Sequence, residues 1–254
     1  MCFDHDSRPP IVPNPTGMLE AADLVLEAPD GNRFAAHLAR AAEPTGAAIV
    51  ILPDIRGLHA YYRELTERFA EHGVDAISID YFGRTAGLTD RGPDFDHRPH
   101  VAQTTYAGLS ADIRVAVDRL RAEVSPERLY TTGFCMGGRL SFLTATMDLG
   151  LAGVIGFYGW PVGKGLSDIP APAEHAAEMT CPVLGIFGGA DEGIPKSASD
   201  EFERALEAAS VDHCLTVYEG APHSFFDRKA ADFVQQSDRA WAETLGFMGV
   251  AKPA

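Results

Sequence analysis

The sequence predicts a single α/β domain built on a mostly parallel sheet. Short apolar or β-branched runs alternate with segments in which apolar residues recur at helical spacing, which is typical of a parallel sheet with helices on both faces. The chain has 254 residues, enough for one large core, and neither a composition shift nor a repeat divides it. We therefore expect one domain over residues 1–254, with flexible tails at 1–17 and 250–254.

The first half of the chain predicts an antiparallel hairpin at the sheet edge and two inner strands. An Asp-Gly turn favours the hairpin, and a continuous apolar run indicates a strand buried on both faces. The expected elements are a hairpin at 24–28 and 34–39, a strand at 47–53, a helix with Tyr61, Leu65 and Phe69 on one face, and a strand at 75–81.

The second half begins with an aperiodic segment, 82–104, rich in Gly, Pro, Asp, Arg and His, and a loop of that length is usually functional or mobile. Helices and strands then alternate to the end of the chain. The expected elements are helices at 109–124, 140–147, 196–209 and 230–245, and strands at 129–132, 153–159, 182–188 and 213–218.

Composition excludes several classes of protein. The net charge of −15 argues against a nucleic-acid partner, and the chain has neither an apolar run of membrane length nor a signal peptide at its start. Its four cysteines are scattered, which fits a reducing cytoplasm rather than a disulfide framework. Asp96, His97 and His100 match no strong metal-ligand spacing, so we expect no metal site.

The strongest chemical signal is the segment 131–139. It predicts a strand, a corner at Cys135 and a helix, with glycines two positions before and two after the cysteine. Glycines suit this corner because a Cβ would clash where strand and helix meet, and the corner residue has a strained backbone. The N–H of Met136 and the positive end of the helix dipole then point at the thiol, which favours a thiolate. The alternative is a buried cysteine beside packing glycines.

Two further candidates follow later strands. Asp191 comes after the strand at 182–188 and His223 after the strand at 213–218, and sites in parallel sheets form at these ends of strands. The chain order of nucleophile, acid and base is that of the α/β hydrolases. We expect His223 to take the thiol proton and Asp191 to orient the imidazole, with Glu192 as the rival acid. Taken singly, each would be an ordinary turn or loop residue.

A hydrolase of this kind also needs two N–H donors for an oxyanion. Met136 is one expected donor, and Ile55, in the loop after Leu52, is the other. Asp54 in the same loop is expected to contact the thiol or the base, or else to serve only as a turn residue.

With these residues in view, the chain resembles the dienelactone hydrolase family of α/β hydrolases over roughly residues 20–248. The most specific match is the Cys-centred elbow Gly-Phe-Cys-Met-Gly-Gly at 133–138. Asp191 and His223 fall at the family's acid and base positions, and the His-Ser-Phe run at 223–225 also fits. The resemblance implies an α/β-hydrolase fold and a cysteine nucleophile, and this chemistry needs no cofactor.

The resemblance also implies substrate contacts. The family pairs its resting thiol with a carboxylate, typically Glu, where this chain has the shorter Asp54. Its reference members hold a substrate carboxylate with two arginines. Arg84 matches the first, whereas Asp227 stands at the second. Other candidates for the pocket are Arg56, Arg228, Tyr158 and Trp160. The alternative is that the arginines are solvated charges on loops and that the two aromatic side chains only pack in the core.

We therefore expect a cytoplasmic hydrolase that cleaves a small ester or lactone bearing a carboxylate, through a thioester on Cys135. The expected partner is this small molecule, with no nucleic acid and no membrane, and the oligomeric state stays open. Two alternatives remain: a carboxylesterase or thioesterase of broad specificity, and a non-catalytic hydrolase fold that binds a small molecule or senses oxidants through Cys135.

Overall fold

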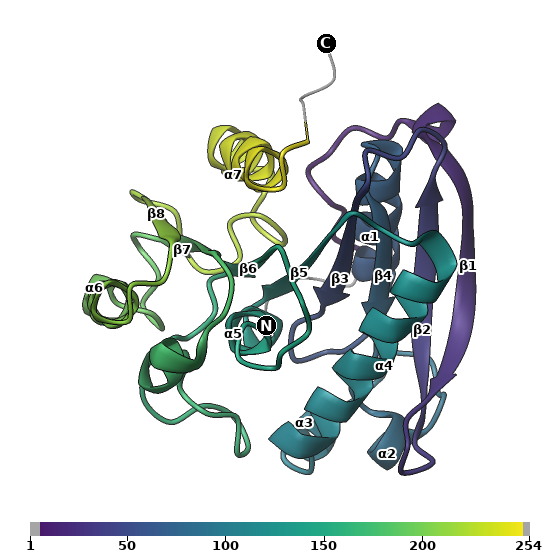
Figure 1. The fold of residues 1–254 in the computed structure, drawn as a ribbon, viewed down its shortest axis with the longest axis horizontal. Helices are drawn as coiled ribbons and strands as arrows, with labels where there is room; N and C mark the ends of the chain where they lie inside the picture. The colour runs from purple at the N-terminus through teal and green to yellow at the C-terminus, as the bar shows by residue number, and fades with distance from the viewer. Residues whose placement is uncertain (1–5, 251–254) are drawn as a thin grey trace.

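An eight-stranded sheet forms the centre of the computed structural model, which describes residues 6–250 (Figure 1). Its strand order is β1-β2-β4-β3-β5-β6-β7-β8. Strands β4 to β8 pair in parallel, whereas β1 and β2 form the expected antiparallel edge, so the predicted fold class is confirmed. The strands are β1 (Met18–Glu27), β2 (Arg33–Ala41), β3 (Ala47–Leu52), β4 (Asp75–Ile79), β5 (Arg128–Phe134), β6 (Gly153–Phe157), β7 (Val183–Gly188) and β8 (His213–Tyr218).

Helices cover both faces of this sheet (Figure 1). They are α1 (Ala60–Glu71), α2 (Gly83–Ala86), α3 (Arg98–Val101), α4 (Tyr106–Val124), α5 (Met136–Thr144), α6 (Lys196–Ala208) and α7 (Val234–Phe247), with 3-10 turns at Pro15–Gly17 and Pro172–Glu178.

The two faces have separate cores because side chains alternate along a strand. All six side chains of β3 are buried. Ile49 packs in the core that contains Leu65 of α1, whereas Val50 packs in the core that contains Ile113 of α4. Strand β3 therefore has no solvent-facing side, which explains the unbroken apolar run in its sequence.

The ends of the chain differ from the sequence expectation. Ile11 is buried in the core, and the N–H of Asn14 donates to the Glu71 carboxylate at 2.8 Å, so this part of the expected tail is attached to the body of the protein, although residues 12–16 are exposed. Val250 is likewise buried. The remainder of the expected tails, 1–5 and 251–254, lies outside the described residues.

Two other boundaries are also different. The last helix starts at Val234, not at 230, because the chain after His223 first turns: Ser224 has φ 64° and its carbonyl accepts a hydrogen bond from the N–H of Lys229. The aperiodic segment 82–104 includes the short helices α2 and α3. Arg91 in this segment forms an ion pair with the buried Asp80, with 2.9 Å between Nη2 and Oδ2.

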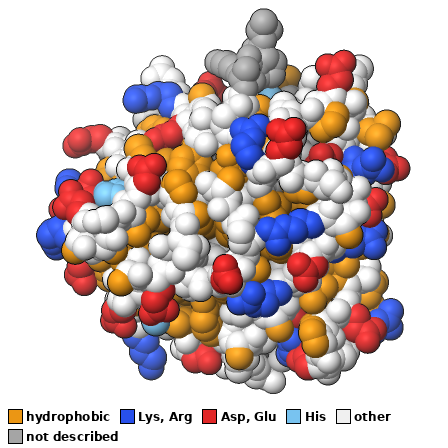
Figure 2. Space-filling view, in the orientation of Figure 1, with side chains coloured by type: hydrophobic (Ala, Val, Ile, Leu, Met, Phe, Trp, Pro, Cys, Tyr) orange, Lys and Arg blue, Asp and Glu red, His pale blue; other side chains and the backbone are white. Residues whose placement is uncertain are grey.

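Helix length and surface charge bear on the expectations from composition. Within residues 6–250, none of the helices has the length and apolarity that crossing a bilayer requires. On the face shown in Figure 2, acidic side chains are interspersed with basic ones rather than gathered in one patch.

Three glycines of β5 and α5 lie too close to neighbouring backbone for any side chain to fit. A Cβ on Gly133 would lie 2.0 Å from the carbonyl oxygen of Gly137. A Cβ on Gly137 would lie 2.0 Å from the carbonyl oxygen of Leu52, and one on Gly138 would lie 2.5 Å from that of Phe157. Because these obstacles are backbone atoms, they cannot move aside without displacing whole strands.

We predict that Gly137→Ala destabilises the protein by at least about 3 kcal/mol, because the added methyl group overlaps the end of β3. Gly246→Ala is the matched control. It lies near the end of α7 with nothing within 4 Å of the added Cβ, and we expect it to raise stability by about 0.5–1 kcal/mol. Urea unfolding of both variants measures the difference, and equal effects would contradict this packing account.

Candidate active site

Cys135 occupies the corner between β5 and α5. Its backbone has φ 54° and ψ −113°, a conformation that non-glycine residues rarely adopt, and its N–H donates to the carbonyl of Phe157 at 3.0 Å. Strain of this kind costs on the order of 1–3 kcal/mol and persists only where the surroundings enforce it. Here the close contacts of Gly133, Gly137 and Gly138 and the start of α5 enforce it, and the side chain is half-buried at the edge of a pocket.

His223 and Asp191 meet at the carboxyl ends of β8 and β7. Imidazole Nδ1 lies 2.6 Å from Asp191 Oδ2. The other carboxylate oxygen of Asp191 accepts hydrogen bonds from the N–H groups of Gly193 at 2.8 Å and Ile194 at 3.1 Å. Three donors therefore fix this carboxylate, while the rival Glu192 is exposed. The arrangement orients the ring with Nδ1 toward the acid and leaves Nε2 for the thiol.

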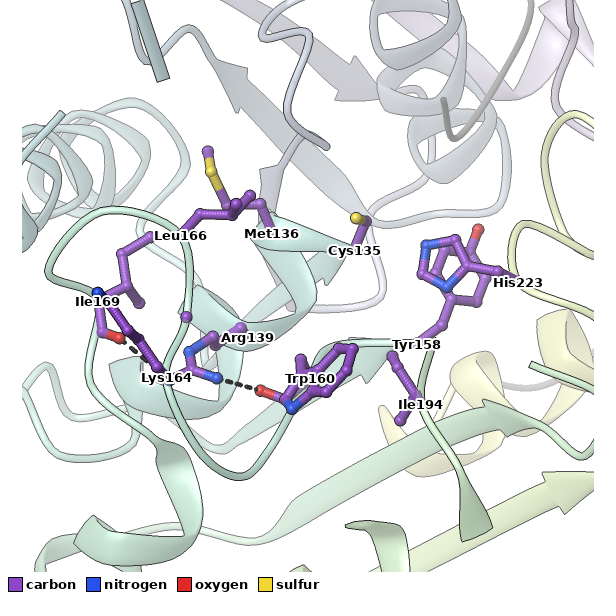
Figure 3. A pocket seen from close by; sticks show the side chains of 11 residues that line it. Cys135, Met136, Arg139, Tyr158, Trp160, Lys164, Leu166, Ile169, Ile194 and His223 are labelled. Carbon is purple, nitrogen blue, oxygen red and sulfur yellow. Dashed lines mark hydrogen bonds between the residues drawn. The ribbon is translucent and has the colours of Figure 1, made fainter. Parts of the chain in front are cut away.

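The His223 ring lies next to the Cys135 side chain (Figure 3). Burial alone would lower the pKa of His223, but hydrogen bonds to Asp191 and Cys135 outweigh it and raise the pKa to about 10. A protonated imidazole next to a thiol favours the thiolate form of that thiol. The Tyr158 ring flanks the imidazole, with 4.8 Å between ring centroids.

The two expected oxyanion donors, Met136 and Ile55, follow the carboxyl ends of the neighbouring strands β5 and β3. Met136 is the first residue of α5, whose leading N–H groups have no acceptor within the helix. Ile55 is half-buried in the turn after β3, and β3 pairs with β5 up to Leu52 and Gly133. Met136 lines the pocket of Cys135, and the role of both N–H groups stays a prediction.

Two other carboxyl groups are buried behind the thiol. Asp54 is fully buried, its Oδ1 accepts from the N–H of Arg56 at 2.8 Å, and burial together with the charge of Cys135 raises its pKa well above the usual range. Asp227 accepts a hydrogen bond from the Tyr158 hydroxyl at 2.5 Å and another from the N–H of Arg228. Burial raises the pKa of Asp227 to about 7 in spite of these bonds.

In the sequence, Asp227 was noted only because it stands where the family has its second arginine. No sequence pattern predicted that it would be a buried acid bonded to Tyr158. The raised pKa of Asp54 favours its neutral form, which would add no repulsion to a thiolate. Its expected contact with the thiol stays a prediction, although the pKa of Asp54 responds to Cys135.

A pocket of about 320 Å³ opens beside Cys135 and His223. Tyr158 and Trp160 line it, as expected, together with residues that sequence reasoning did not single out (Figure 3). These further residues are Arg139, Lys164, Gly165, Leu166, Ile169 and Ile194. They come from α5 and from the loops after β6 and β7, and no motif in the sequence distinguishes them.

The arginines expected at the substrate lie elsewhere. Arg84 does not line this pocket: its guanidinium pairs with Asp30 at 2.9 Å and with the buried Asp112 at 2.5 Å, beside a separate, open hollow. We therefore correct the expectation that Arg84 holds the substrate, because its guanidinium is already paired with the carboxylates of Asp30 and Asp112. Arg56 is buried and Arg228 half-buried, and neither lines the pocket.

The residues that could have suggested a metal have other contacts. Asp96 accepts a hydrogen bond from the N–H of Arg98, and the His100 ring stacks on Phe95 with centroids 5.1 Å apart. In the described part of the chain, no three His, Cys, Asp or Glu side chains are grouped to hold a metal ion.

Comparisons with known proteins point to one family. The profile of the dienelactone hydrolase family matches residues 34–251. A Salmonella typhimurium protein named "Putative carboxymethylenebutenolidase" is 30% identical over 226 residues, covering 85% of this chain and 82% of its own. The carboxymethylenebutenolidase of Rhodococcus opacus is 29% identical over 188 residues, 71% of each chain. The crystal structure of a "putative dienelactone hydrolase" from Klebsiella pneumoniae superposes with a TM-score of 0.79 at 26% identity, covering 92% of this chain and all of the other.

The paired thiol and imidazole predict an unusual pH profile for alkylation. Because His223 stays protonated up to about pH 10, Cys135 should react with iodoacetamide at a nearly constant rate from about pH 6 to 9. In His223→Ala the rate at about pH 6 should fall roughly tenfold or more. Peptide mapping by mass spectrometry follows Cys135, with the exposed Cys214 as internal reference. A wild-type profile that rises like that of a free thiol would contradict the ion pair.

The buried Asp227 predicts a pH-dependent stability. A pKa raised from 3.8 to about 7 means that the folded state binds the extra proton, so this contribution is complete below about pH 4 and is lost as the pH rises to about 7. Asp227→Asn keeps the shape without the ionisation. Its free energy of unfolding relative to wild type should therefore increase from about pH 5 to 8, by on the order of 2–4 kcal/mol.

Urea unfolding at both pH values checks this expectation, with the exposed Asp238→Asn as control. A constant difference between wild type and Asp227→Asn would show that Asp227 ionises as freely in the folded protein as in the unfolded chain.

Proposed function

Because the chain belongs to the dienelactone hydrolase family and is a hydrolase of that type, we propose that it cleaves a small ester or lactone through Cys135, His223 and Asp191. The observation that supports the proposal most is the His223 ring, which lies between the Asp191 carboxylate, 2.6 Å away, and the thiol at the mouth of a pocket. Nucleophile, base and orienting acid need this relative placement.

The proposed reaction has two halves. The thiolate of Cys135 attacks the ester carbonyl, and the N–H groups of Met136 and Ile55 bind the oxygen as it becomes negative. His223 gives its proton to the departing alkoxide or enolate, which leaves a thioester on the sulfur. The imidazole, now neutral, takes a proton from water. The hydroxide attacks the thioester, and the carboxylic acid product leaves as the thiolate and imidazolium are restored.

The electrostatics favour an activated ester over an amide. A thiolate held by a strongly basic imidazole is a good nucleophile but also a good leaving group, so the first tetrahedral intermediate returns to reactants unless the alcohol leaves readily. Enol lactones and aryl esters have such leaving groups. The carboxylate expected on the substrate is part of the same proposal, although Arg84 is not its binding residue.

A second candidate on the same fold is a carboxylesterase or thioesterase of broad specificity. It is favoured by the position of Arg84 outside the pocket and by the mainly apolar pocket wall. Apolar side chains select a substrate by its size rather than by a particular functional group. The apolar residues of the wall are Met136, Trp160, Leu166, Ile169 and Ile194.

We predict that Cys135→Ala lowers kcat/KM for p-nitrophenyl acetate and for a dienelactone by at least about 1,000-fold without unfolding the protein, because no other thiol lines the pocket among the described residues. Cys214→Ala, at an exposed site, should leave both activities unchanged. Turnover of the dienelactone alone supports the narrow hydrolase, and turnover of both supports the broad esterase. Residual activity near wild type in Cys135→Ala would overturn the nucleophile assignment.

A further inference from the structure

The charged side chains that line the active-site pocket are all basic. The protein as a whole has a net charge of −15, yet Arg139 and Lys164 line the pocket with His223, and no Asp or Glu does so among the described residues. A concave site with charge opposite to that of the rest of the protein concentrates anionic small molecules.

Arg139 cannot bind a ligand directly, because its donors are already used. Its Nε donates to the carbonyl of Pro170 at 2.8 Å, Nη1 to Trp160 at 2.9 Å, and Nη2 to Gly163 at 2.8 Å. Two further bonds reach the carbonyls of Val162 and Ile169. A guanidinium has five N–H groups, so Arg139 holds the loop 160–170 in place and adds only its charge to the pocket.

Lys164 lies on the loop that Arg139 holds, and its ammonium makes no hydrogen bond or ion pair with any other described residue. Arg56, Arg84 and Arg228, the cations expected at the substrate, do not line the pocket, and Arg84 is paired with Asp30 and Asp112. Lys164 is therefore the available cation at the pocket wall.

The position of Lys164 sets where on the substrate the anion must be. In Figure 3, Lys164 lies with Leu166 and Ile169 at the end of the pocket opposite Cys135 and His223. Apolar side chains of Met136 and Trp160 stand between the two ends. A substrate that reaches both must have an apolar chain between its reacting carbonyl and its charge.

We propose that Lys164 is a specificity-determining residue that selects esters with a carboxylate at the end remote from the reacting carbonyl. The inference rests on the proposed hydrolysis at Cys135, because Cys135 fixes the other end of the substrate. It concerns a different residue and a different end of the pocket from those the sequence suggested for substrate binding.

The test compares p-nitrophenyl half-esters of dicarboxylic acids from succinate to suberate with p-nitrophenyl esters of uncharged acids of the same length. In Lys164→Met, kcat/KM for the longer half-esters should fall about three- to tenfold through KM, while the uncharged esters keep their values. Lys164→Arg should retain the preference, and Lys164→Glu should lower it further. Lys196→Met, outside the pocket lining, is the matched control and should change neither series.

A second measurement separates this inference from the proposed function. Binding of a dicarboxylic acid monoamide to Cys135→Ala, by calorimetry, should weaken about three- to tenfold when Lys164→Met is added. If wild type hydrolyses no ester but this difference appears, the reaction is wrong and the anion subsite stands. Equal losses for charged and uncharged esters in Lys164→Met, or binding that ignores the substitution, would overturn the role of Lys164.

Discussion

The contact between β5 and α5 is the constraint on which the rest of the site depends. Gly133 lets β5 approach α5, Gly137 and Gly138 let α5 approach the ends of β3 and β6, and Cys135 takes φ 54° to turn the chain between strand and helix. The same turn places the start of α5 under the thiol and leaves the sulfur at the edge of a pocket.

The carboxyl groups around the thiol differ in ionisation because their surroundings differ. Asp191 receives backbone N–H bonds and pairs with His223, so it stabilises a protonated imidazole. Asp54 and Asp227 are buried where burial outweighs their hydrogen bonds, and the pKa of each is raised. One carboxylate thus provides charge, while the raised pKa values of the two nearby carboxyl groups favour their neutral forms and limit the repulsion on a thiolate.

The sequence predicted those features that depend on local pattern. Strand and helix order, the hairpin edge and the elbow at Cys135 follow from hydrophobic period and glycine spacing. The residues of the pocket wall were not predictable. Lys164, Leu166 and Ile169 lie on a loop whose conformation no periodicity specifies, and no motif marks Arg139 of α5 as the residue bonded to that loop. Arg84 was wrongly expected in the substrate pocket because its partners, Asp30 and Asp112, are far from it in sequence. Only the folded chain brings the three side chains together.

The central claim is that the sulfur of Cys135 becomes acylated during hydrolysis. Rapid mixing with a p-nitrophenyl ester, acid quenching within the first turnover and peptide mass spectrometry test it directly. We predict an increase of one acyl group on the peptide that contains Cys135, formed as the p-nitrophenolate burst appears and lost as turnover proceeds. Turnover with no adduct at Cys135, or an adduct on another residue that forms and decays at the catalytic rate, would contradict it.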